Sequence, residues 1–205
     1  MLDLVTAIEA HGIPLEHIDL GGGLGIDYNG DTPPAADALW AQLLAKLDAR
    51  GFGERKLMIE PGRSLVGNAG VCVTEVLYLK PGEHKNFCVV DAAMNDLPRP
   101  AMYQAFHQIV PVQPRSGDGV VYDVVGPVCE SGDCFAKDRS LQEVREGELI
   151  GFLSAGAYGY TMASRYNTRG MAAEVLVKGS AFELIHARET FEQMIAGEKI
   201  PAFLK

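Results

Sequence analysis

Apolar positions in the N-terminal part of the chain alternate between helical spacing and short continuous runs. Leu2, Val5 and Ile8 follow the helical period until Gly12-Ile13-Pro14 interrupts it. Across this part the pattern predicts helices over residues 2–11 and 34–50 and strands over residues 17–20 and 56–60. A helix, strand, helix, strand order is typical of a parallel sheet, and we expect units of a (β/α)8 barrel here.

Beyond about residue 69 the pattern changes to β-rich segments separated by turns. Strands are predicted over Val71–Leu79, Phe87–Asp91, Gly119–Val125, Glu148–Leu153 and Ala173–Val177. These segments predict a second domain that is mainly antiparallel. After it, Glu189–Ala196 is amphipathic and stops at Gly197, which predicts a terminal helix that docks on the rest of the protein.

The predicted fold class is therefore α/β plus all-β, in three parts. Residues 1–68 would form the last two βα units of a partial (β/α)8 barrel, and residues 69–187 a C-terminal antiparallel β domain. Residues 188–205 would form a terminal docking helix and a tail that returns toward the barrel. A closed barrel needs roughly 250 residues, and only about 65 here have a barrel-like pattern, so we expect most of a barrel to be missing.

Composition narrows the classes of function. With 47% hydrophobic and 22% charged residues the chain can bury a core, and its net charge of −9 argues against nucleic-acid or anionic-membrane surfaces. We expect a small-molecule partner. The sequence has no apolar run of the roughly 20 residues that cross a bilayer and no signal-peptide pattern at its start, which predicts a cytoplasmic protein. Its 4 cysteines are too few for a disulfide framework.

Two motifs follow the two predicted barrel strands. Gly21–Gly25 would let backbone N–H groups approach an anion such as a phosphate, although a plain tight turn is about as common, and its spacing fits a dinucleotide-binding fingerprint poorly. Glu60-Pro61-Gly62-Arg63 comes at the end of the next strand, where a surface ion pair is the ordinary alternative. Phosphate sites after the last strands of a barrel recur in enzymes, so the two motifs together favour an anion site.

Three motifs in the β-rich part carry further chemistry. Arg99 lies between prolines in Asp96–Tyr103, which predicts a rigid loop that presents a guanidinium to a carboxylate, or else an ordinary extended loop. Cys129–Asp133 places a thiol and two acids on a turn, where a buried structural cysteine is the commoner reading. Tyr158 lies among small residues in Ala155–Tyr160, where it would reach a ligand or pack.

Taken in order along the chain, these motifs resemble those of the alanine-racemase-like, fold type III decarboxylases that use pyridoxal 5'-phosphate (PLP). The matching segments are Asp19-Leu-Gly-Gly-Gly-Leu-Gly25, Glu60-Pro-Gly-Arg63, Cys129-Glu-Ser-Gly-Asp133 and Gly156-Ala-Tyr-Gly159. The run from Met94 through Arg99-Pro-Ala-Met-Tyr103 to His107 is similar to diaminopimelate decarboxylases rather than to the ornithine or arginine enzymes. The resemblance covers essentially the whole chain, as the C-terminal half of such an enzyme.

The resemblance implies a role for each motif residue. Gly22, Gly23, Gly62 and Arg63 would bind the cofactor phosphate, Glu60 would face the pyridine nitrogen, and Tyr158 would touch cofactor and substrate. Arg63, Arg99 and Tyr103 would hold the distal end of the amino-acid substrate, Glu130 its far ammonium, and Cys129 would donate a proton to Cα. In this family active sites lie at a homodimer interface, so Cys129 and Glu130 would act on the cofactor of the other subunit. The implied reaction converts meso-2,6-diaminopimelate to L-lysine and CO₂.

The sequence departs from the family in two places. The family's Schiff-base lysine lies on an early barrel strand, and none of the lysines here (Lys46, Lys56, Lys80, Lys85, Lys137, Lys178, Lys199 and Lys205) has that sequence context. We therefore expect a truncated piece that is inactive alone. Thr168–Met171 also replaces an Arg-Pro-rich segment. The alternatives are a non-catalytic dimerisation partner of a full-length homologue and a decarboxylase of another basic amino acid or a carboxyspermidine-like substrate.

Overall fold

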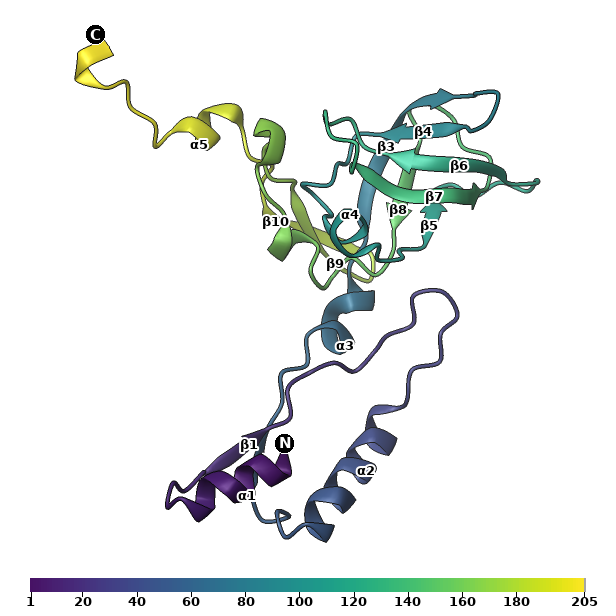
Figure 1. The fold of residues 1–205 in the computed structure, drawn as a ribbon. Helices are drawn as coiled ribbons and strands as arrows, with labels where there is room; N and C mark the ends of the chain where they lie inside the picture. The colour runs from purple at the N-terminus through teal and green to yellow at the C-terminus, as the bar shows by residue number, and fades with distance from the viewer. Residues whose placement is uncertain (205) are drawn as a thin grey trace.

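The N-terminal part of the computed structural model, which describes residues 1–204, contains one parallel βαβ unit preceded by a helix. Its elements are α1 (Leu2–Ala10), β1 (His17–Asp19), α2 (Ala36–Ala49) and β2 (Lys56–Met58). Strands β1 and β2 pair in parallel, with Ile18 opposite Leu57. Figure 1 shows this part below the rest of the molecule, with α3 (Arg63–Val66) leading out of it. The helices and strands expected here are confirmed within a few residues.

A small apolar cluster holds this unit together. Val5 of α1, Ile18 of β1, Leu47 of α2 and Phe52 are buried against one another. Each helix thus contributes one buried side chain to this cluster with the strand pair, Val5 from α1 and Leu47 from the C-terminal end of α2. The arrangement directs the C-terminal ends of both strands, and the loops that follow them, toward α3 and the upper part of the molecule.

The β-rich part forms a six-stranded mixed sheet and a separate hairpin. The sheet has the order β5–β8–β3–β4–β6–β7. Its strands are β3 (Cys72–Lys80), β4 (Phe87–Val90), β5 (Ile109–Pro111), β6 (Val120–Val125), β7 (Cys134–Leu141) and β8 (Leu149–Phe152). The hairpin consists of β9 (Glu174–Lys178) and β10 (Ala181–His186). The strands of the sheet share one hydrophobic core, in which Val76, Val90, Val124 and Phe152 are fully buried.

The structure corrects the sequence prediction in three respects. Strands β4 and β6 pair in parallel, so the sheet, although mainly antiparallel as expected, is mixed. Strands β5, β7 and β10 were not predicted, because β5 is short and β7 carries charges in its middle. Arg99 lies in a short helix, α4 (Arg99–Tyr103), rather than in a loop. Pro98 and Pro100 are compatible with this helix, since the first turn of a helix leaves its N–H groups unpaired.

The C-terminal segment contains a short capped helix. Thr190 and Gln193 form a reciprocal capping box at the start of α5 (Phe191–Ile195). A turn of 3-10 helix, η4 (Ala202–Leu204), follows it, and Phe203 is 86% exposed. In Figure 1 this segment extends away from β1 and β2, so its expected return toward the barrel part stays a prediction. None of the helices within residues 1–204 is long and apolar enough to cross a membrane.

Candidate active site

The loops that follow β1 and β2 touch through their backbones. The amide of Glu60 donates to the carbonyl oxygen of Gly21 at 2.8 Å, and a Cβ atom on Gly22 would lie 2.4 Å from the carbonyl oxygen of Glu60. Gly21 and Gly23 have positive φ angles of 69° and 92°, which favour glycine. The sequence expectation of a glycine turn beside the Glu60 loop is thus matched by the geometry.

These two loops leave a group of backbone donors unpaired. Within residues 1–204, the N–H groups of Gly22, Gly23, Gly62 and Arg63 donate no hydrogen bond. Gly22 and Gly23 are exposed, and Arg63 begins α3. Unpaired N–H groups on neighbouring loops suit an anion such as a phosphate. The Glu60 side chain, also exposed, lies at the edge of the same loops.

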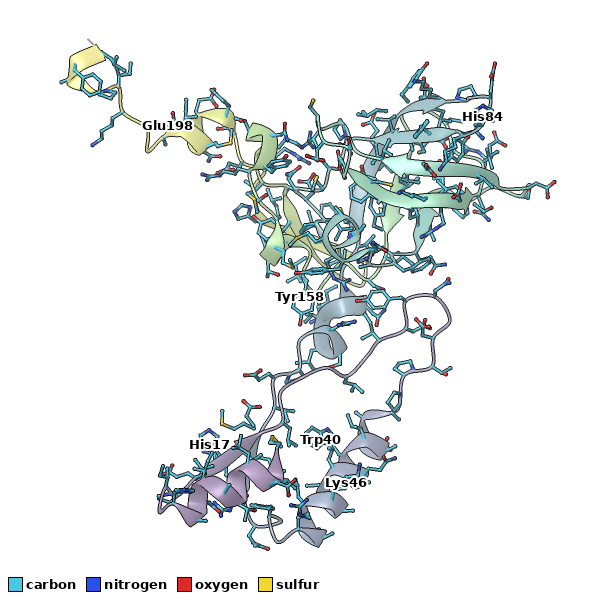
Figure 2. All side chains as sticks on the ribbon, viewed as in Figure 1. His17, Trp40, Lys46, His84, Tyr158 and Glu198 are labelled. Atoms are coloured by element: carbon cyan, nitrogen blue, oxygen red, sulfur yellow. The ribbon has the colours of Figure 1, made fainter. Side chains whose placement is uncertain are left out.

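The two loops with the unpaired N–H groups of Gly22, Gly23, Gly62 and Arg63 form an anion cradle. Tyr158, from the β-rich part, lies against it. Its hydroxyl lies 2.8 Å from the position that a Cβ atom on Gly62 would occupy. Tyr158 itself has a positive φ of 60°, an unusual backbone state for a non-glycine residue that is found mostly where function or packing requires it. Figure 2 shows Tyr158 at the junction between α3 and the sheet. The predicted cofactor residues Gly22, Glu60, Gly62 and Tyr158 therefore meet at one place.

Arg99 is buried beside this junction without an acidic partner. Only 7% of its surface is exposed, and none of the ion pairs within residues 1–204 includes it. Its guanidinium carbon lies 5.4 Å from the centre of the Tyr28 ring and 6.0 Å from that of Tyr158. Arg63 lies 5.9 Å from the Tyr28 ring. Two arginines and two aromatic rings thus form a cationic, partly apolar surface at the cradle.

His107 is the hydrogen-bond partner of Arg99. Arg99 Nη1 lies 3.2 Å from His107 Nε2, and His107 Nδ1 lies 2.8 Å from the carbonyl oxygen of Leu153. Burial lowers the pKa of His107, as do the charges of Arg99 and Arg139, against the hydrogen bond to Leu153. The ring is therefore the neutral partner of a buried cation. The sequence marked His107 only as part of a motif and did not mark Tyr28, since both roles depend on contacts between distant segments.

The remaining predicted residues form a second, separate group. Cys129 and Glu130 are exposed on the loop between β6 and β7. Glu130 accepts a hydrogen bond from Gly132 N at 3.0 Å and from the Tyr166 hydroxyl at 3.4 Å. Within residues 1–204 no hydrogen bond, ion pair or ring contact links this loop to Arg63, Arg99 or Tyr158. Tyr103, at the end of α4, is also exposed.

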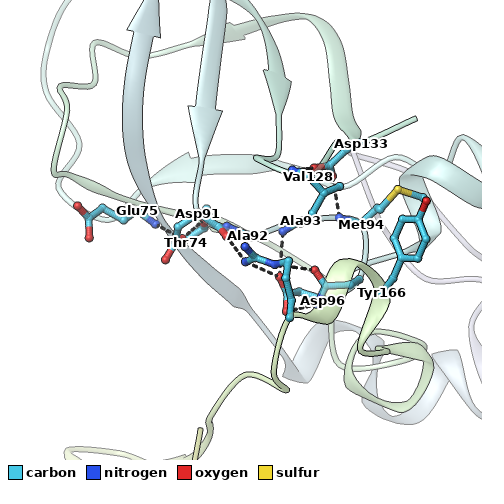
Figure 3. Close-up of polar contacts among 12 residues, drawn as sticks. Thr74, Glu75, Asp91, Ala92, Ala93, Met94, Asp96, Val128, Asp133 and Tyr166 are labelled. Atoms are coloured by element: carbon cyan, nitrogen blue, oxygen red, sulfur yellow. Dashed lines mark hydrogen bonds and ion pairs between the residues drawn. The ribbon is translucent and has the colours of Figure 1, made fainter. Parts of the chain in front are cut away.

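A buried carboxylate holds the Cys129 loop in place. Asp133 accepts from Met94 N at 2.7 Å and from Val128 N at 3.0 Å, as Figure 3 shows. Burial raises the pKa of Asp133, although both amides act in the opposite direction. A Cβ atom on Gly126 would lie 2.2 Å from the Asp133 carboxylate, so a glycine is needed there. Asp133 thus joins the Cys129 loop to the segment that leads into α4.

The loop that departs from the family pattern is fastened to the same segment. Arg169 Nε donates to Asn95 Oδ1 at 2.9 Å, and Arg169 Nη2 donates to the carbonyl oxygen of Asp91. Its guanidinium also lies 3.6 Å from Asp96. Thr168–Met171 therefore keeps a defined attachment despite its altered sequence.

Neither lysine of the barrel-like part, Lys46 or Lys56, lies beside the cradle. Lys46 is exposed on α2, and Figure 2 shows it far from Tyr158. Lys56 opens β2, at the end of the strand away from Glu60. Among residues 1–204 there is also no group of three or more His, Cys, Asp or Glu side chains arranged to hold a metal ion. The cradle thus offers anion donors and a carboxylate but no amine.

The sequence and the fold match those of known decarboxylases. Residues 8–156 match the family described as "Pyridoxal-dependent decarboxylase, C-terminal sheet domain". The diaminopimelate decarboxylases of Neisseria meningitidis serogroup A and Pseudomonas aeruginosa are 52% and 50% identical over 97% and 98% of the chain. The structure of diaminopimelate decarboxylase from M. jannaschii in co-complex with L-lysine has a TM-score of 0.87 and 37% identity, and the match covers 100% of this chain.

Two further comparisons limit what this similarity shows. The structure of SrLDC in complex with PLP and cadaverine has a TM-score of 0.71 at 22% identity, which shows a shared fold alone. The chain spans about half the length of the curated relatives it matches, 48% of the Neisseria protein and 47% of the Pseudomonas protein. Its β-rich part has the fold of the C-terminal sheet domain of fold type III decarboxylases. The chain therefore belongs to the pyridoxal-dependent decarboxylase family, and the curated relatives to which it is about 50% identical are diaminopimelate decarboxylases.

Proposed function

We propose that this chain supplies the C-terminal part of a PLP-dependent diaminopimelate decarboxylase, which forms L-lysine and CO₂ in lysine biosynthesis. In this proposal residues 1–68 are the last two βα units of a (β/α)8 barrel, residues 69–187 the sheet domain and residues 188–205 a docking tail. The observation that carries the proposal is the buried Arg99, which has no acidic partner within residues 1–204 and lies beside an anion cradle. A buried cation calls for an anion, and here the substrate's distal carboxylate provides it.

The residues of the cradle fit the phosphate and the ring of PLP. Four unpaired N–H groups, those of Gly22, Gly23, Gly62 and Arg63, would hold the phosphate together with the Arg63 side chain. Glu60 would face the pyridine nitrogen and keep a proton there, and Tyr158 would lie against cofactor and substrate. When bound, PLP supplies the electron withdrawal that lets Cα lose CO₂. The lysine that anchors its aldehyde in the family has no counterpart among these residues.

Both charged groups at the distal end of the substrate would be held. Arg99 donates to the distal carboxylate, with Arg63 and Tyr103 completing that end, and Glu130 pairs with the distal ammonium. A substrate that carries both a carboxylate and an ammonium at its far end matches this set, whereas a plain basic amino acid has only the ammonium and would leave the Arg99 guanidinium without an anion. This difference favours diaminopimelate over the other basic amino acids considered from the sequence.

We further propose that the working site lies at a homodimer interface. Cys129 holds the proton that Cα receives after CO₂ leaves, and it acts with Glu130 on the cofactor bound by the other subunit. The separation of these two residues from the Arg99 group within one chain supports this arrangement. The cytoplasmic location expected from the sequence stays a prediction.

The experiment is reconstitution. The purified chain is mixed with a polypeptide that corresponds to the other half of the N. meningitidis relative, PLP and meso-diaminopimelate, and released CO₂ and L-lysine are measured. We expect activity only in the complete mixture. Arg99→Leu should lower kcat/KM by roughly 100-fold, because a charge-assisted hydrogen-bond pair contributes about 2–3 kcal/mol. Arg188→Leu, which changes an exposed arginine, is the matched control and should have little effect.

Other outcomes would contradict the proposal in distinct ways. Sustained CO₂ release by the chain alone would show that the cofactor needs no lysine from elsewhere. A reconstituted assembly that decarboxylates L-lysine or L-ornithine better than diaminopimelate would overturn the assignment of the substrate. Co-purification with a full-length homologue, without activity in any mixture, would instead support the non-catalytic partner.

A further inference from the structure

We infer that His107 is a positioning residue for Arg99, whose neutral ring holds the guanidinium in the orientation that receives the substrate's distal carboxylate. The inference rests on the proposed function, because it concerns the same site. It adds a residue that does not touch the substrate but decides whether Arg99 is ready to bind it.

The two contacts of the imidazole determine its protonation state. The carbonyl oxygen of Leu153, 2.8 Å from His107 Nδ1, only accepts hydrogen bonds, so Nδ1 must carry a proton. The guanidinium of Arg99, 3.2 Å from His107 Nε2, only donates, so Nε2 must have a free lone pair. Only the neutral tautomer with a proton on Nδ1 satisfies both. A protonated ring would direct an N–H group at the N–H of a buried cation.

Neighbouring elements also favour the neutral state of the His107 ring. The groups that face the His107 side chain or its backbone are Arg99 of α4, Arg139 of β7, the Leu153 carbonyl after β8 and the Tyr28 ring after β1. Arg139 Nη1 donates to the carbonyl oxygen of His107 at 2.8 Å, and its guanidinium stacks on Phe106 at 4.2 Å. Both charges are positive and the site is buried, and these effects lower the pKa of His107. No carboxylate within residues 1–204 hydrogen-bonds to the ring to favour protonation.

This pair restricts the Arg99 side chain. One Nη1 hydrogen points at His107, and the rings of Tyr28 and Tyr158 lie 5.4 Å and 6.0 Å from the guanidinium carbon. A planar guanidinium held at one corner presents its other N–H groups in a fixed direction, which is what two-point recognition of a carboxylate requires. Loss of the acceptor on His107 would leave the guanidinium free to rotate.

The test begins with the unsubstituted chain and needs no activity. Histidine nitrogens labelled with ¹⁵N are followed by NMR from about pH 8 to about pH 5, and the His107 signal is assigned by its disappearance in His107→Gln. We expect the tautomer protonated on Nδ1 and a pKa below 6.5. A tautomer protonated on Nε2, or a pKa above 6.5, would overturn the inference.

The second measurement is the rotation of the Arg99 guanidinium, taken from the exchange rate between its two Nη nitrogens. His107→Leu removes the acceptor and should speed the exchange by about tenfold, in line with the loss of one hydrogen bond. His107→Gln can donate to Leu153 and accept from Arg99, and it should keep the exchange rate near that of the parent. His84→Leu, at a position far from Tyr158 in Figure 2, should have no effect. Equal rates in His107→Leu and the parent would sink the positioning role.

In the reconstituted enzyme the same variants separate positioning from folding. We expect His107→Leu to raise KM for meso-diaminopimelate about tenfold with kcat nearly unchanged, and His107→Gln to restore KM. The KM of the parent should also rise as pH falls through the His107 pKa, and that of His107→Gln should not. If reconstitution fails, the proposed function is in doubt while the two NMR measurements still decide the role of His107.

Discussion

A Cβ atom on Gly22 would lie 2.4 Å from the carbonyl oxygen of Glu60, so the two loops of the cofactor cradle are in direct backbone contact. Gly22→Ala would push these loops apart, since neither the new methyl group nor the carbonyl can move aside cheaply. We expect a loss of stability of about 2 kcal/mol and at least a tenfold weaker affinity for PLP phosphate, roughly 1.4 kcal/mol. Urea unfolding and a phosphorus NMR titration with PLP measure the two effects.

Gly25→Ala is the matched control for Gly22→Ala. A Cβ atom on Gly25 would lie 3.7 Å from Cβ of Pro33, an ordinary van der Waals contact, and Gly25 does not have a positive φ. This variant should unfold and bind PLP like the parent. Equal behaviour of Gly22→Ala and Gly25→Ala would show that the cradle does not depend on the close approach of the loops.

A second prediction concerns the carboxylate that holds the Cys129 loop. Asp133→Ala leaves the partly buried amides of Met94 and Val128 without acceptors, which should cost about 2–3 kcal/mol of unfolding free energy. Hydrogen exchange of the amides around Cys129 should become faster by about tenfold or more. Asp133→Asn keeps one acceptor oxygen, so its stability and exchange rates should lie between those of the parent and of Asp133→Ala. Asp118→Ala, at an exposed position, should match the parent. Unchanged exchange in Asp133→Ala would rule out the clamp.

The regular elements of the barrel-like part could be predicted because their apolar spacing is simple. The helical period of α1 and α2 and the short runs of β1 and β2 determine those elements locally. The strand β7 could not be predicted in this way, since Lys137, Asp138 and Arg139 interrupt its apolar pattern and its pairing with β6 shifts register twice. The tertiary neighbours of β7, not its own sequence, make it a strand.

The residues of the candidate site likewise divide into those with a local sequence signal and those that depend on tertiary contacts. Gly22, Glu60 and Arg99 could be selected from sequence because a glycine turn, an acid at the end of a strand and an arginine between prolines carry local signals. The partnership of Arg99 with His107 could not, because it depends on a ring that also contacts Leu153, 46 residues further along the chain. Likewise, Tyr28 could not be selected from sequence, because its role depends on two arginines from other elements that pack on its ring.

A third prediction tests the attachment of the Thr168–Met171 loop. Arg169→Lys keeps a positive charge near Asp96 but loses the hydrogen bonds from the guanidinium to Asn95 and to the Asp91 carbonyl. We expect unfolding in urea to show a loss of about 1–2 kcal/mol. Arg188→Lys, at an exposed position, should leave the unfolding midpoint unchanged. If both variants were equally stable, Arg169 would act through its charge alone.

The last prediction concerns stability in acid. The hydrogen bonds from Arg115 lower the pKa of Glu148 from its ordinary value of 4.5 to about 2. Because the unfolded chain then binds a proton that the folded chain does not, this contribution to stability is fully present above pH 4.5 and is lost as pH falls toward about 2. Arg115→Ala should therefore be less stable than the parent near neutral pH, and the difference should shrink steadily through this interval. Urea midpoints at a series of pH values measure it, with Arg188→Ala as the control. A difference between Arg115→Ala and the parent that stays constant from neutral pH down to about pH 2 would show that Glu148 does not depend on Arg115 for its charge.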